Sequence, residues 1–501
     1  MLIRLRGSGP LHERLYQEVR GAVLSGRARA GERLPSTRGL AEELGVSRTV
    51  VIQAYDRLLA EGYLTARVGA GTFVAEGLPS GTSKSWGNEE PLPGGPAGVA
   101  AKPRPSAWAA AVTKLRRHTG RDTGLRLDFR YGRPSPEGFP SRAWRRALSR
   151  AGKELRTGYG DPRGSPRLRE ALAAHLARSR AVVTEAERIV LVTGSQQALD
   201  LVARVVLAPG DAVLLEEPHY QGARQVFQAA GGRLVPTRVD DQGLVTEGLP
   251  GGARMAYVTP SHQFPLGGVL PLRRRLELLA WASREDAVVV EDDYDSEYRH
   301  VGAPVEAVQA LDREGRILYL GTLSKVLFPA LRAGYLVLPE AWVETFAAAK
   351  WLTDRHSPTL EQEALAIFIG EGHFERHLRR TRRSLGERRG ALLDALDREL
   401  AGRVRVEGAD AGMHVVVWLD ELPADRVGAV VEEGALRGVG LYAVAPYYLE
   451  PPERAGLVLG YASLTPERIR RGVSALRAAL DAVTHGAPEP LAHLLRPPHH
   501  A

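Results

Sequence analysis

The spacing of apolar residues changes along this chain of 501 residues, and the changes mark its parts. Near the N-terminus, Leu11, Leu15, Val19 and Val23 recur at the spacing of one face of a helix. From about residue 125 onward, short apolar runs of strand length alternate with helical patterns. That alternation is typical of an α/β domain built on a mostly parallel sheet.

Two further helices are predicted after the first one. Ser36 is placed to cap a helix from Thr37 to Leu44, which Gly45 ends. Ser47 is placed to cap a third helix, from about Arg48 to Glu61. Two short helices joined by a tight turn that contains a glycine match the helix-turn-helix pattern.

A hairpin follows these helices. Residues 62–74 contain two short alternating runs around a glycine-rich tip, which predicts two strands and a wing. A glycine-rich tip lets the backbone approach a duplex closely. Residues 1–75 are therefore predicted to form a winged helix-turn-helix DNA-binding domain, called the head below.

Charge supports a polyanionic partner for the head. The chain carries 67 Lys and Arg against 59 Asp and Glu, a net charge of +8, and the head holds 11 arginines against 7 acids. Ser47, Arg48 and Thr49 open the third helix, where amides attract phosphate and where recognition helices read base edges. Arg38 and Arg67 are placed to hold the DNA backbone. The alternative is that these are solvated charges at helix and hairpin ends.

The segments that flank the second domain have a different composition. Residues 76–124 are predicted to be a flexible linker, because six Pro and six Gly fall within its first 32 residues. A short basic helix is predicted within residues 108–122. Residues 483–501 are predicted to be a disordered tail, and we interpret its His499 and His500 as chance rather than metal ligands, so no metal site is expected.

Composition also bears on the compartment. There is no cysteine, no apolar run of 18 residues and no signal peptide pattern at the N-terminus. We expect a cytoplasmic protein without a membrane span, disulfide or thiolate chemistry.

One lysine is the first candidate for chemistry. The chain has six lysines against 61 arginines, and Lys325 follows a predicted buried strand at residues 316–320. Open α/β sheets bind ligands just past such strand ends. Unlike a guanidinium, an amine can lose its proton and form a Schiff base with an aldehyde.

A carboxylate and a phenol follow another predicted buried strand, residues 287–291. A pyridine-based electron sink requires a carboxylate at its ring nitrogen, benefits from a phenol near its ring oxygen, and uses an amine for covalent attachment. Asp292, Tyr294 and Lys325 supply one of each at successive strand ends. The competing interpretation, a solvated acidic loop and an unrelated lysine, explains each piece but not their combination.

Two further candidates depend on context. Ser195 and Gln196 begin a predicted helix directly after a strand, where backbone amides can bind phosphate, although such strand–turn–helix caps are common. Tyr220, after another strand, can stack on a flat ring or belong to the core.

The head resembles the GntR family of bacterial winged-helix regulators. The resemblance rests on residues 35–41, 45–50 and 58–64, and it covers nearly all of residues 9–75. It implies a double-stranded operator DNA as partner. The residues implied to contact DNA are Arg38, Ser47, Arg48, Thr49, Arg67 and Gly69.

Residues 125–482 resemble the fold-type-I aminotransferases that use pyridoxal 5'-phosphate, and the two parts together resemble the MocR/GabR/PdxR group of regulators. The motifs are residues 259–265, 291–298 and 321–325. The implied fold class is α/β, with a mostly parallel sheet in a large domain and a small α+β C-terminal domain.

The resemblance also assigns roles to the site residues. Lys325 is the Schiff-base lysine, Asp292 the partner of the pyridinium and Tyr294 the phenol near the ring oxygen. Tyr220 is the ring-stacking residue, and Tyr159 reaches the phosphate of the neighbouring subunit, which implies a head-to-tail homodimer. The implied phosphate-site residues are Ser195, Gln196, Thr322, Ser324 and Arg332.

The sequence departs from ordinary aminotransferases in two places. The Asn that binds the cofactor's ring oxygen is absent, because Phe264 precedes Pro265, so we expect His262 or Gln263 to take part. The Arg that binds the substrate carboxylate is absent from residues 441–448, and Arg454 is the nearest. The departures argue against full transamination and against sensing of a GABA-like amino acid.

The preferred hypothesis is a DNA-binding transcriptional regulator whose vestigial aminotransferase domain senses pyridoxal phosphate, with an amino compound as a further candidate effector. One alternative is an active aminotransferase with an accessory DNA-binding head, and a transaminase half-reaction is left open. Another is a DNA-binding protein whose second domain serves only for dimerisation.

Overall fold

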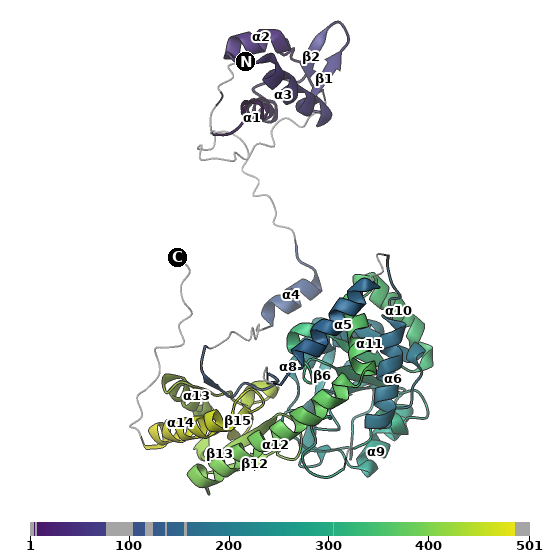
Figure 1. Ribbon diagram of the computed structural model, residues 1–501, viewed down its shortest axis with the longest axis vertical. Coiled ribbons are helices and arrows are strands. Elements are labelled where there is room, and N and C mark those ends of the chain that lie inside the picture. The colour runs from purple at the N-terminus through teal and green to yellow at the C-terminus, as the bar shows by residue number, and fades with distance from the viewer. Residues whose placement is uncertain are drawn as a thin grey trace. The chain divides into compact units, whose positions relative to one another are not determined.

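The structure is a computed structural model in which the chain divides into two compact units, Met1–Pro103 and Arg104–Ala501 (Figure 1). The residues that it describes are 5, 8–76, 104–115, 124–135, 138–154, 158–303 and 305–485. Most of the predicted linker and the tail from residue 486 onward, with His499 and His500, therefore lie outside the described residues.

The first unit has the winged helix-turn-helix fold that the sequence predicts. Its elements are α1 (Leu11–Leu24), α2 (Thr37–Leu44), α3 (Arg48–Ala60), β1 (Leu64–Arg67) and β2 (Gly71–Val74). The two strands pair in antiparallel register and form the wing. Leu15, Leu40, Val51 and Leu58 are fully buried and join the three helices into one core.

The turn between α2 and α3 is set by local chemistry. The Ser36 hydroxyl accepts a hydrogen bond from the Gly39 amide at 3.1 Å, which caps α2 as predicted. Gly45 ends α2 with φ +65°, a left-handed conformation that favours glycine. Ser47 occupies the N-cap position of α3, but its side chain makes no capping bond. Its hydroxyl is therefore not committed to stabilising the helix.

The second unit is built on a mixed, mostly parallel sheet in the order β4-β11-β10-β9-β8-β5-β6-β7. Its strands are β4 (Ile189–Val192), β5 (Ala212–Glu217), β6 (Arg233–Asp240), β7 (Gly243–Leu244), β8 (Ala253–Val258), β9 (Val288–Asp293), β10 (Ile317–Thr322) and β11 (Gly334–Val337). Strands β6, β5, β8, β9 and β10 run parallel, so their carboxyl ends share one edge. The mostly parallel sheet predicted from the sequence is confirmed.

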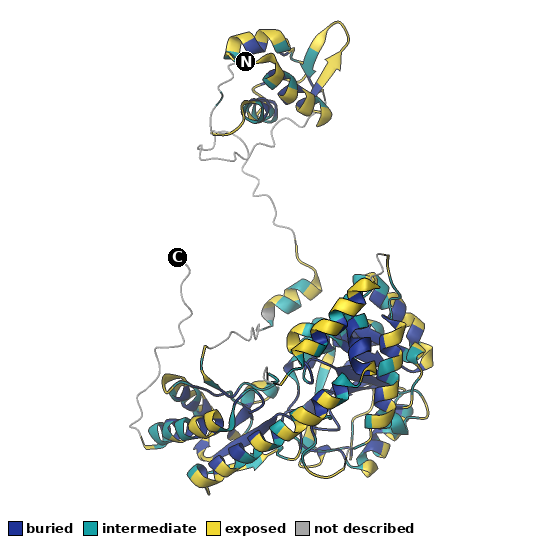
Figure 2. Cartoon of the chain, viewed as in Figure 1, coloured by how far each residue is buried: buried dark blue, intermediate teal, exposed yellow. Residues whose placement is uncertain are grey.

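Helices cover both faces of this sheet, as Figure 2 shows by the burial of the strands between them. On one face Val190, Leu318 and their neighbours pack with α7 (Ser195–Val206), α8 (Gln221–Ala229) and α10 (Glu340–Asp354). On the other face lie α5 (Ser141–Lys153), α6 (Pro166–Arg180), α9 (Leu272–Arg284) and α11 (Thr359–Gly370). Strand residues alternate between the two cores, as buried parallel strands require.

Three helices, separated by short breaks, follow β11. α10 ends at Asp354, Pro358 precedes α11, and Gly372 with φ +70° precedes α12 (His373–Leu400). Proline and left-handed glycine both interrupt a helix, which is why the apolar periodicity restarts at these points.

A smaller α+β part completes the second unit. It contains an antiparallel sheet of β12 (Val404–Glu407), β13 (His414–Pro423) and β15 (Arg454–Gly460), with α13 (Val427–Leu436) and α14 (Pro466–His485). β3 (Leu127–Asp128) pairs in parallel with β14 (Val439–Gly440), so the segment that precedes the large sheet is tied to the C-terminal part.

Shorter elements connect these parts. The helix expected within residues 108–122 is α4 (Ala107–Lys114), which packs beside α8, and residues 116–123 lie outside the described residues. The short 3-10 helices are η1 (Ala186–Arg188), η2 (Val308–Leu311), η3 (Pro329–Leu331), η4 (Ala424–Arg426) and η5 (Ala445–Tyr447). Every helix in the described part of the chain is too short or too polar to cross a bilayer.

Candidate cofactor pocket and nucleic-acid interface

A cavity of 140 Å³ lies where the carboxyl ends of the parallel strands meet. Its lining residues are Tyr131, Gly132, Ser195, Tyr220, Tyr257, Thr259, Phe264, Asp292, Tyr294, Thr322, Ser324, Lys325, Pro329 and Arg332. Eight of the eleven residues proposed from the sequence as cofactor ligands are therefore brought together, and this space is called the cofactor cavity below.

Asp292 supplies a buried carboxylate to the cavity from the end of β9. The Tyr257 hydroxyl donates to its Oδ2 at 2.6 Å, while Oδ1 is buried without a hydrogen-bond partner among the described residues. Burial raises the pKa of Asp292 to about 7, against the opposing effects of the Tyr257 hydrogen bond and the Lys325 charge. A buried carboxylate oxygen without a partner fits a ligand that presents a cationic N–H group.

Lys325 enters the cavity from the loop after β10. Its Nζ lies 3.4 Å from the carbonyl oxygen of Gly132 and 5.3 Å from the centre of the Tyr131 ring. Burial lowers the pKa of Lys325, although the charges of Asp295 and Asp292 act in the opposite direction. A lowered pKa increases the neutral fraction of the amine, which is the form that attacks an aldehyde.

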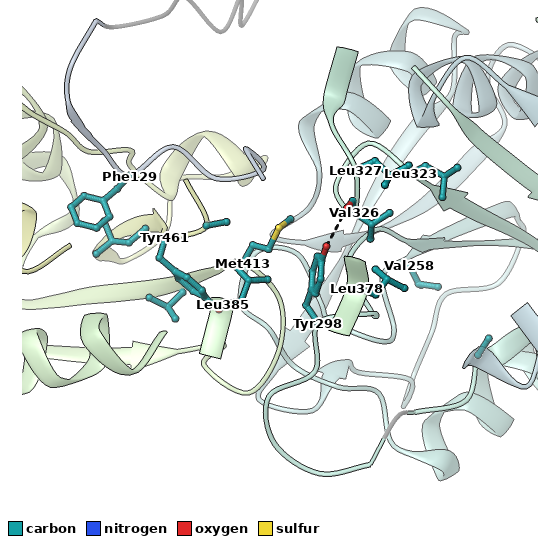
Figure 3. Close-up of a cluster of buried hydrophobic side chains, with 14 of the residues drawn as sticks. Phe129, Val258, Tyr298, Leu323, Val326, Leu327, Leu378, Leu385, Met413 and Tyr461 are labelled. Carbon is teal, nitrogen blue, oxygen red and sulfur yellow. Dashed lines mark hydrogen bonds between the residues drawn. The ribbon is translucent and has the colours of Figure 1, made fainter. Parts of the chain in front are cut away.

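The backbone at Gly132 packs closely against the Lys325 side chain. A side chain at Gly132 would begin 2.4 Å from Nζ, and Gly132 has φ +75°, so both space and conformation favour glycine there. Below the loop, the Tyr298 hydroxyl donates to the Val326 carbonyl at 3.4 Å, among Leu323 and Leu327 (Figure 3). The apolar residues that flank Lys325 are thus part of the core, and they hold the loop in place.

Hydroxyl groups and one guanidinium gather at another side of the cavity. Ser195 is the first residue of α7, and Thr322 and Ser324 precede Lys325. The Ser324 hydroxyl is buried without a partner in the described part of the chain. Arg332 donates to the Thr193 carbonyl at 2.9 Å and packs on Gly194, where a Cβ would lie 2.7 Å from it. A helix start, hydroxyls and an arginine together suit a phosphate group.

Tyr220 forms an aromatic wall of the cavity. Its ring packs so closely on Gly222 that a Cβ there would lie 2.5 Å away. The Gln196 side chain donates to the Gly222 carbonyl at 3.1 Å, so Gln196 supports this wall and its side chain is not part of the cavity lining. Tyr220 is thereby held in one orientation.

Two of the residues proposed from the sequence lie elsewhere. His262 is buried, does not line the cavity and contacts Tyr294, which does. Tyr159 is 79% exposed and lies beside the rings of Trp351 and His356, at 6.0 and 5.9 Å. An exposed tyrosine is available to a second subunit.

Six of the lining residues were not proposed from the sequence, among them Tyr131, Gly132 and Tyr257. Tyr131 and Gly132 come from a segment almost two hundred residues before Lys325, with no strand of the large sheet in front of them. Tyr257 lies inside β8, where its hydroxyl within the apolar run from Met255 to Val258 was the signal that could have been used.

The residues 441–448 contribute no arginine near the cavity, as the sequence indicates. Arg454 lines a separate cavity of 350 Å³ together with Trp418, Asp410 and Glu407. Among the described residues, Arg332 is thus the only arginine in the cofactor cavity.

The head presents its candidate DNA-binding residues to solvent. Arg38 and Arg48 line one hollow between α2 and α3, and Ser47 and Thr49 beside them are exposed. Arg38 pairs with Glu42 at 3.3 Å, and the Arg48 Nε donates to the Thr37 hydroxyl at 3.4 Å. These contacts are exposed and weak, so they compete little with a phosphate.

The wing carries the other two candidates. Arg67 pairs with Glu76 at 3.0 Å, and its guanidinium lies 5.0 Å from the centre of the Phe73 ring. Gly69 forms the exposed tip with φ +76°, and no atom lies within 4 Å of the position of a Cβ. The space beside the Gly69 backbone is therefore open on the side where a side chain would lie.

Two families match this chain. Residues 11–74 match the bacterial regulatory proteins of the gntR family, and residues 130–476 match the aminotransferase class I and II family.

Relatives extend the likeness across both units. The chain is 39% identical to the probable rhizopine catabolism regulatory protein MocR of Rhizobium meliloti, over 96% of each chain. It is 32% identical to the pyridoxine biosynthesis transcriptional regulator PdxR of Corynebacterium glutamicum, over 91% of this chain and 93% of the relative. Among solved structures, LysN, an α-aminoadipate aminotransferase of Thermus thermophilus in complex with N-(5'-phosphopyridoxyl)-L-leucine, is 32% identical over 75% of this chain and 97% of its own, with a TM-score of 0.68. The fold-type-I aminotransferase fold is thereby confirmed.

Replacing Arg48 tests the surface at the start of α3. We expect Arg48→Ala to weaken binding to a cognate duplex by about 1–3 kcal/mol if the guanidinium reads a base edge. The measurement is fluorescence anisotropy with cognate and scrambled duplexes at fixed salt. Arg27→Ala, which removes an arginine paired with Glu18 of α1, is the control. An equal loss on both duplexes would identify a phosphate contact, and no loss would exclude Arg48 from the interface.

Replacing Asp292 tests its buried charge. A carboxyl whose pKa is raised to about 7 by folding keeps a proton that the unfolded chain has released, so the free energy of unfolding falls as pH rises from about 4 to about 7. Without cofactor, we expect Asp292→Asn to lose less stability than the wild type between pH 5 and pH 8, by about 2 kcal/mol. Urea unfolding at the two pH values measures this difference.

The pH dependence of the wild type must be compared with that of Asp292→Asn, because burial also raises the pKa values of Glu216 and Glu291 to about 7. These carboxyls are present in both proteins, and their contributions cancel. Parallel loss of stability in wild type and Asp292→Asn would contradict the prediction.

Proposed function

This chain belongs to the MocR type of regulators, in which a GntR-family head precedes an aminotransferase class I and II domain, and we propose that pyridoxal phosphate, bound at Lys325, controls DNA binding by the head. DNA-binding regulation is the activity of the chain in this proposal, and the aminotransferase-like domain serves as its sensor.

The observation that carries the proposal is the composition of the cofactor cavity. It combines the amine of Lys325, a buried Asp292 carboxylate whose Oδ1 has no partner among the described residues, and a hydroxyl-rich end with Arg332. An aldehyde, a protonatable ring nitrogen and a phosphate on one small molecule match these three features. Since a buried carboxylate oxygen without a partner is costly, the cavity favours such a ligand.

Pyridoxal phosphate supplies an aldehyde that an amine can join and a pyridine ring that withdraws electrons. In the proposed arrangement Asp292 holds the proton of the ring nitrogen, Tyr220 stacks on the ring, and Tyr294 faces the ring oxygen. Lys325 provides the covalent attachment. The residues proposed to bind the phosphate are Ser195, Gln196 through its backbone amide, Thr322, Ser324 and Arg332.

Control of DNA binding requires that the cofactor bind two states of the protein with different affinity. We propose that these states belong to a head-to-tail homodimer, in which the exposed Tyr159 of one subunit approaches the phosphate of the other. The contacts with DNA are proposed for Arg38, Ser47, Arg48, Thr49, Arg67 and Gly69.

An amino compound remains a second candidate effector. Arg332 is the one arginine among the lining residues described, and it lies at the proposed phosphate end. A substrate carboxylate therefore lacks a second arginine among the described lining residues, which favours the cofactor itself as the ligand that is sensed.

Replacing Lys325 tests the proposal directly. We expect Lys325→Ala to lose covalent binding of pyridoxal phosphate and the response of DNA binding to it, while DNA binding without cofactor stays within about 0.5 kcal/mol of the wild type. The measurements are the visible absorbance on titration, peptide mapping after borohydride reduction, and anisotropy with an upstream duplex. Lys153→Ala, an exposed lysine of α5, is the control.

Each other outcome has a distinct meaning. A reduced label on a peptide without Lys325 would overturn the proposed site, and cofactor binding without any change in DNA binding would overturn regulation by the cofactor. Steady conversion of an amino acid and an oxo acid, abolished by Lys325→Ala, would favour an active aminotransferase.

A further inference from the structure

We propose that His262 and Asp295 are positioning residues that fix the Tyr294 hydroxyl as a hydrogen-bond donor toward the cofactor's ring oxygen. This inference rests on the proposed function, because it concerns how the cavity holds pyridoxal phosphate.

The side chains of Asp295, His262 and Tyr294 are linked by successive polar contacts. The His262 Nδ1 lies 2.9 Å from the Tyr294 hydroxyl oxygen and 3.1 Å from both carboxylate oxygens of Asp295. The side chains of His262 and Asp295 are each 1% exposed, whereas Tyr294 lines the cavity. The pair thus stands behind Tyr294 and reaches the cavity only through it.

The carboxylate decides where the proton of the imidazole lies. If Nδ1 carried a lone pair, it would face two carboxylate oxygens at hydrogen-bond distance in a fully buried site, which is repulsive. Nδ1 therefore carries a hydrogen and donates, in the neutral ring as well as in the imidazolium. This single hydrogen is shared between the Asp295 carboxylate and the Tyr294 oxygen, so the Tyr294 oxygen can only accept from Nδ1.

This assignment sets the direction of the Tyr294 proton. A hydroxyl that accepts from Nδ1–H cannot donate its own hydrogen to that nitrogen, so the O–H can point into the cavity. The pKa of Tyr294 is raised well above its usual range, first by burial and then by the Asp295 charge, and the phenol therefore keeps its proton. The result is a donor of fixed polarity at the cavity wall.

A donor at Tyr294 compensates for the missing asparagine noted in the sequence. Where ordinary aminotransferases place an Asn at the ring oxygen, this chain has Phe264, whose ring lies 5.8 Å from that of Tyr294 and offers no hydrogen bond. With one donor fewer at that oxygen, the remaining phenol must point its hydrogen in one direction only. His262 and Asp295 enforce this direction.

The surroundings hold the pair in place from several elements. A Cβ at Gly412 would lie 2.4 Å from Asp295 and 2.3 Å from the His262 ring, so the backbone before β13 encloses both. The other ionisable groups that act on His262 or pack on it are Arg299, His300 and His414. Burial disfavours the imidazolium, but the Asp295 charge and hydrogen bond raise the pKa of His262 overall. Burial also lowers the pKa of His414 to about 3, so that neighbour adds no positive charge.

The ordinary interpretation is a buried histidine that satisfies a buried acid for stability alone. The two interpretations differ in one observable. A donor at the ring oxygen stabilises negative charge on that oxygen. It therefore lowers the pH at which the bound cofactor loses the proton that lies between its ring oxygen and the Lys325 nitrogen. Packing alone leaves this pH midpoint unchanged.

The test is a pH titration of the visible absorbance band of the full-length protein with bound pyridoxal phosphate. We expect His262→Leu and Tyr294→Phe each to raise the pH midpoint by about 0.5–1 unit and to weaken cofactor binding about 5-fold. Because His262 acts through Tyr294, the double variant should match Tyr294→Phe alone. His262→Asn, whose amide can donate from the place of Nδ1, should restore the wild-type midpoint.

His175→Leu is the matched control. His175 is also buried and lies 2.8 Å from a carboxylate, that of Glu375, but it does not line the cofactor cavity. If His262→Leu does not fold, Asp295→Asn tests the same chain, since it removes the charge that keeps the hydrogen on Nδ1, and it should raise the midpoint likewise.

The contrary outcomes are equally specific. An unchanged midpoint in both His262→Leu and Asp295→Asn, equal shifts in His262→Leu and His262→Asn, or additive shifts in the double variant would each overturn the positioning role. Failure of the wild type to bind pyridoxal phosphate would instead overturn the proposed function, and the two failures are distinguished by the wild-type spectrum.

Discussion

The site depends on the burial of three consecutive acids at the end of β9. Glu291 accepts hydrogen bonds from the backbone amides of Val308 and Gln309, and Asp293 pairs with Arg180 at 2.7 Å. Between them, Asp292 points to the opposite face of the strand, where a single tyrosine hydroxyl meets it. Burying a carboxylate without a cation is unfavourable, and burial raises the pKa of Asp292 to about 7. Glu291 thus has two backbone amides and Asp293 an arginine as partners, whereas the hydrogen-bond partner of Asp292 among the described residues is the Tyr257 hydroxyl.

The same strand end explains why the surrounding structure is rigid. Parallel strands carry their carboxyl ends to one edge, and Asp292, Lys325, Ser195 and Tyr220 each follow a different strand to that edge. The loop that bears Lys325 is held by the core, and Gly132 and Gly222 allow backbone to touch Lys325 and Tyr220 directly. Positions held by packing lose little conformational freedom on binding, so the cavity is suited to a ligand that must be held in one orientation.

The sequence predicts the strands and the residues at their ends, but not the contacts between segments that are distant in the chain. Apolar runs locate the strands, and strand ends locate Asp292 and Lys325, because both depend on local pattern. Tyr131 and Gly132 reach the cavity from a segment distant in sequence, and no local pattern encodes that contact. His262 shows the same limit in another form. Its motif indicates proximity to the ring, but only the fold places Tyr294 in front of it and Asp295 beside it.

The corner between β5 and α8 joins the cavity to the C-terminal part of the second unit. α8 begins directly after Tyr220, and its Gln221 and Arg224 donate to the carbonyls of Pro446 and Tyr448 at 2.6 and 3.1 Å. α4, the helix through which the chain enters the second unit, packs beside the same α8. α8 therefore contacts both the loop at residues 446–448 and α4. Tyr220, the C-terminal part of the second unit and α4 thus all meet at one helix, α8.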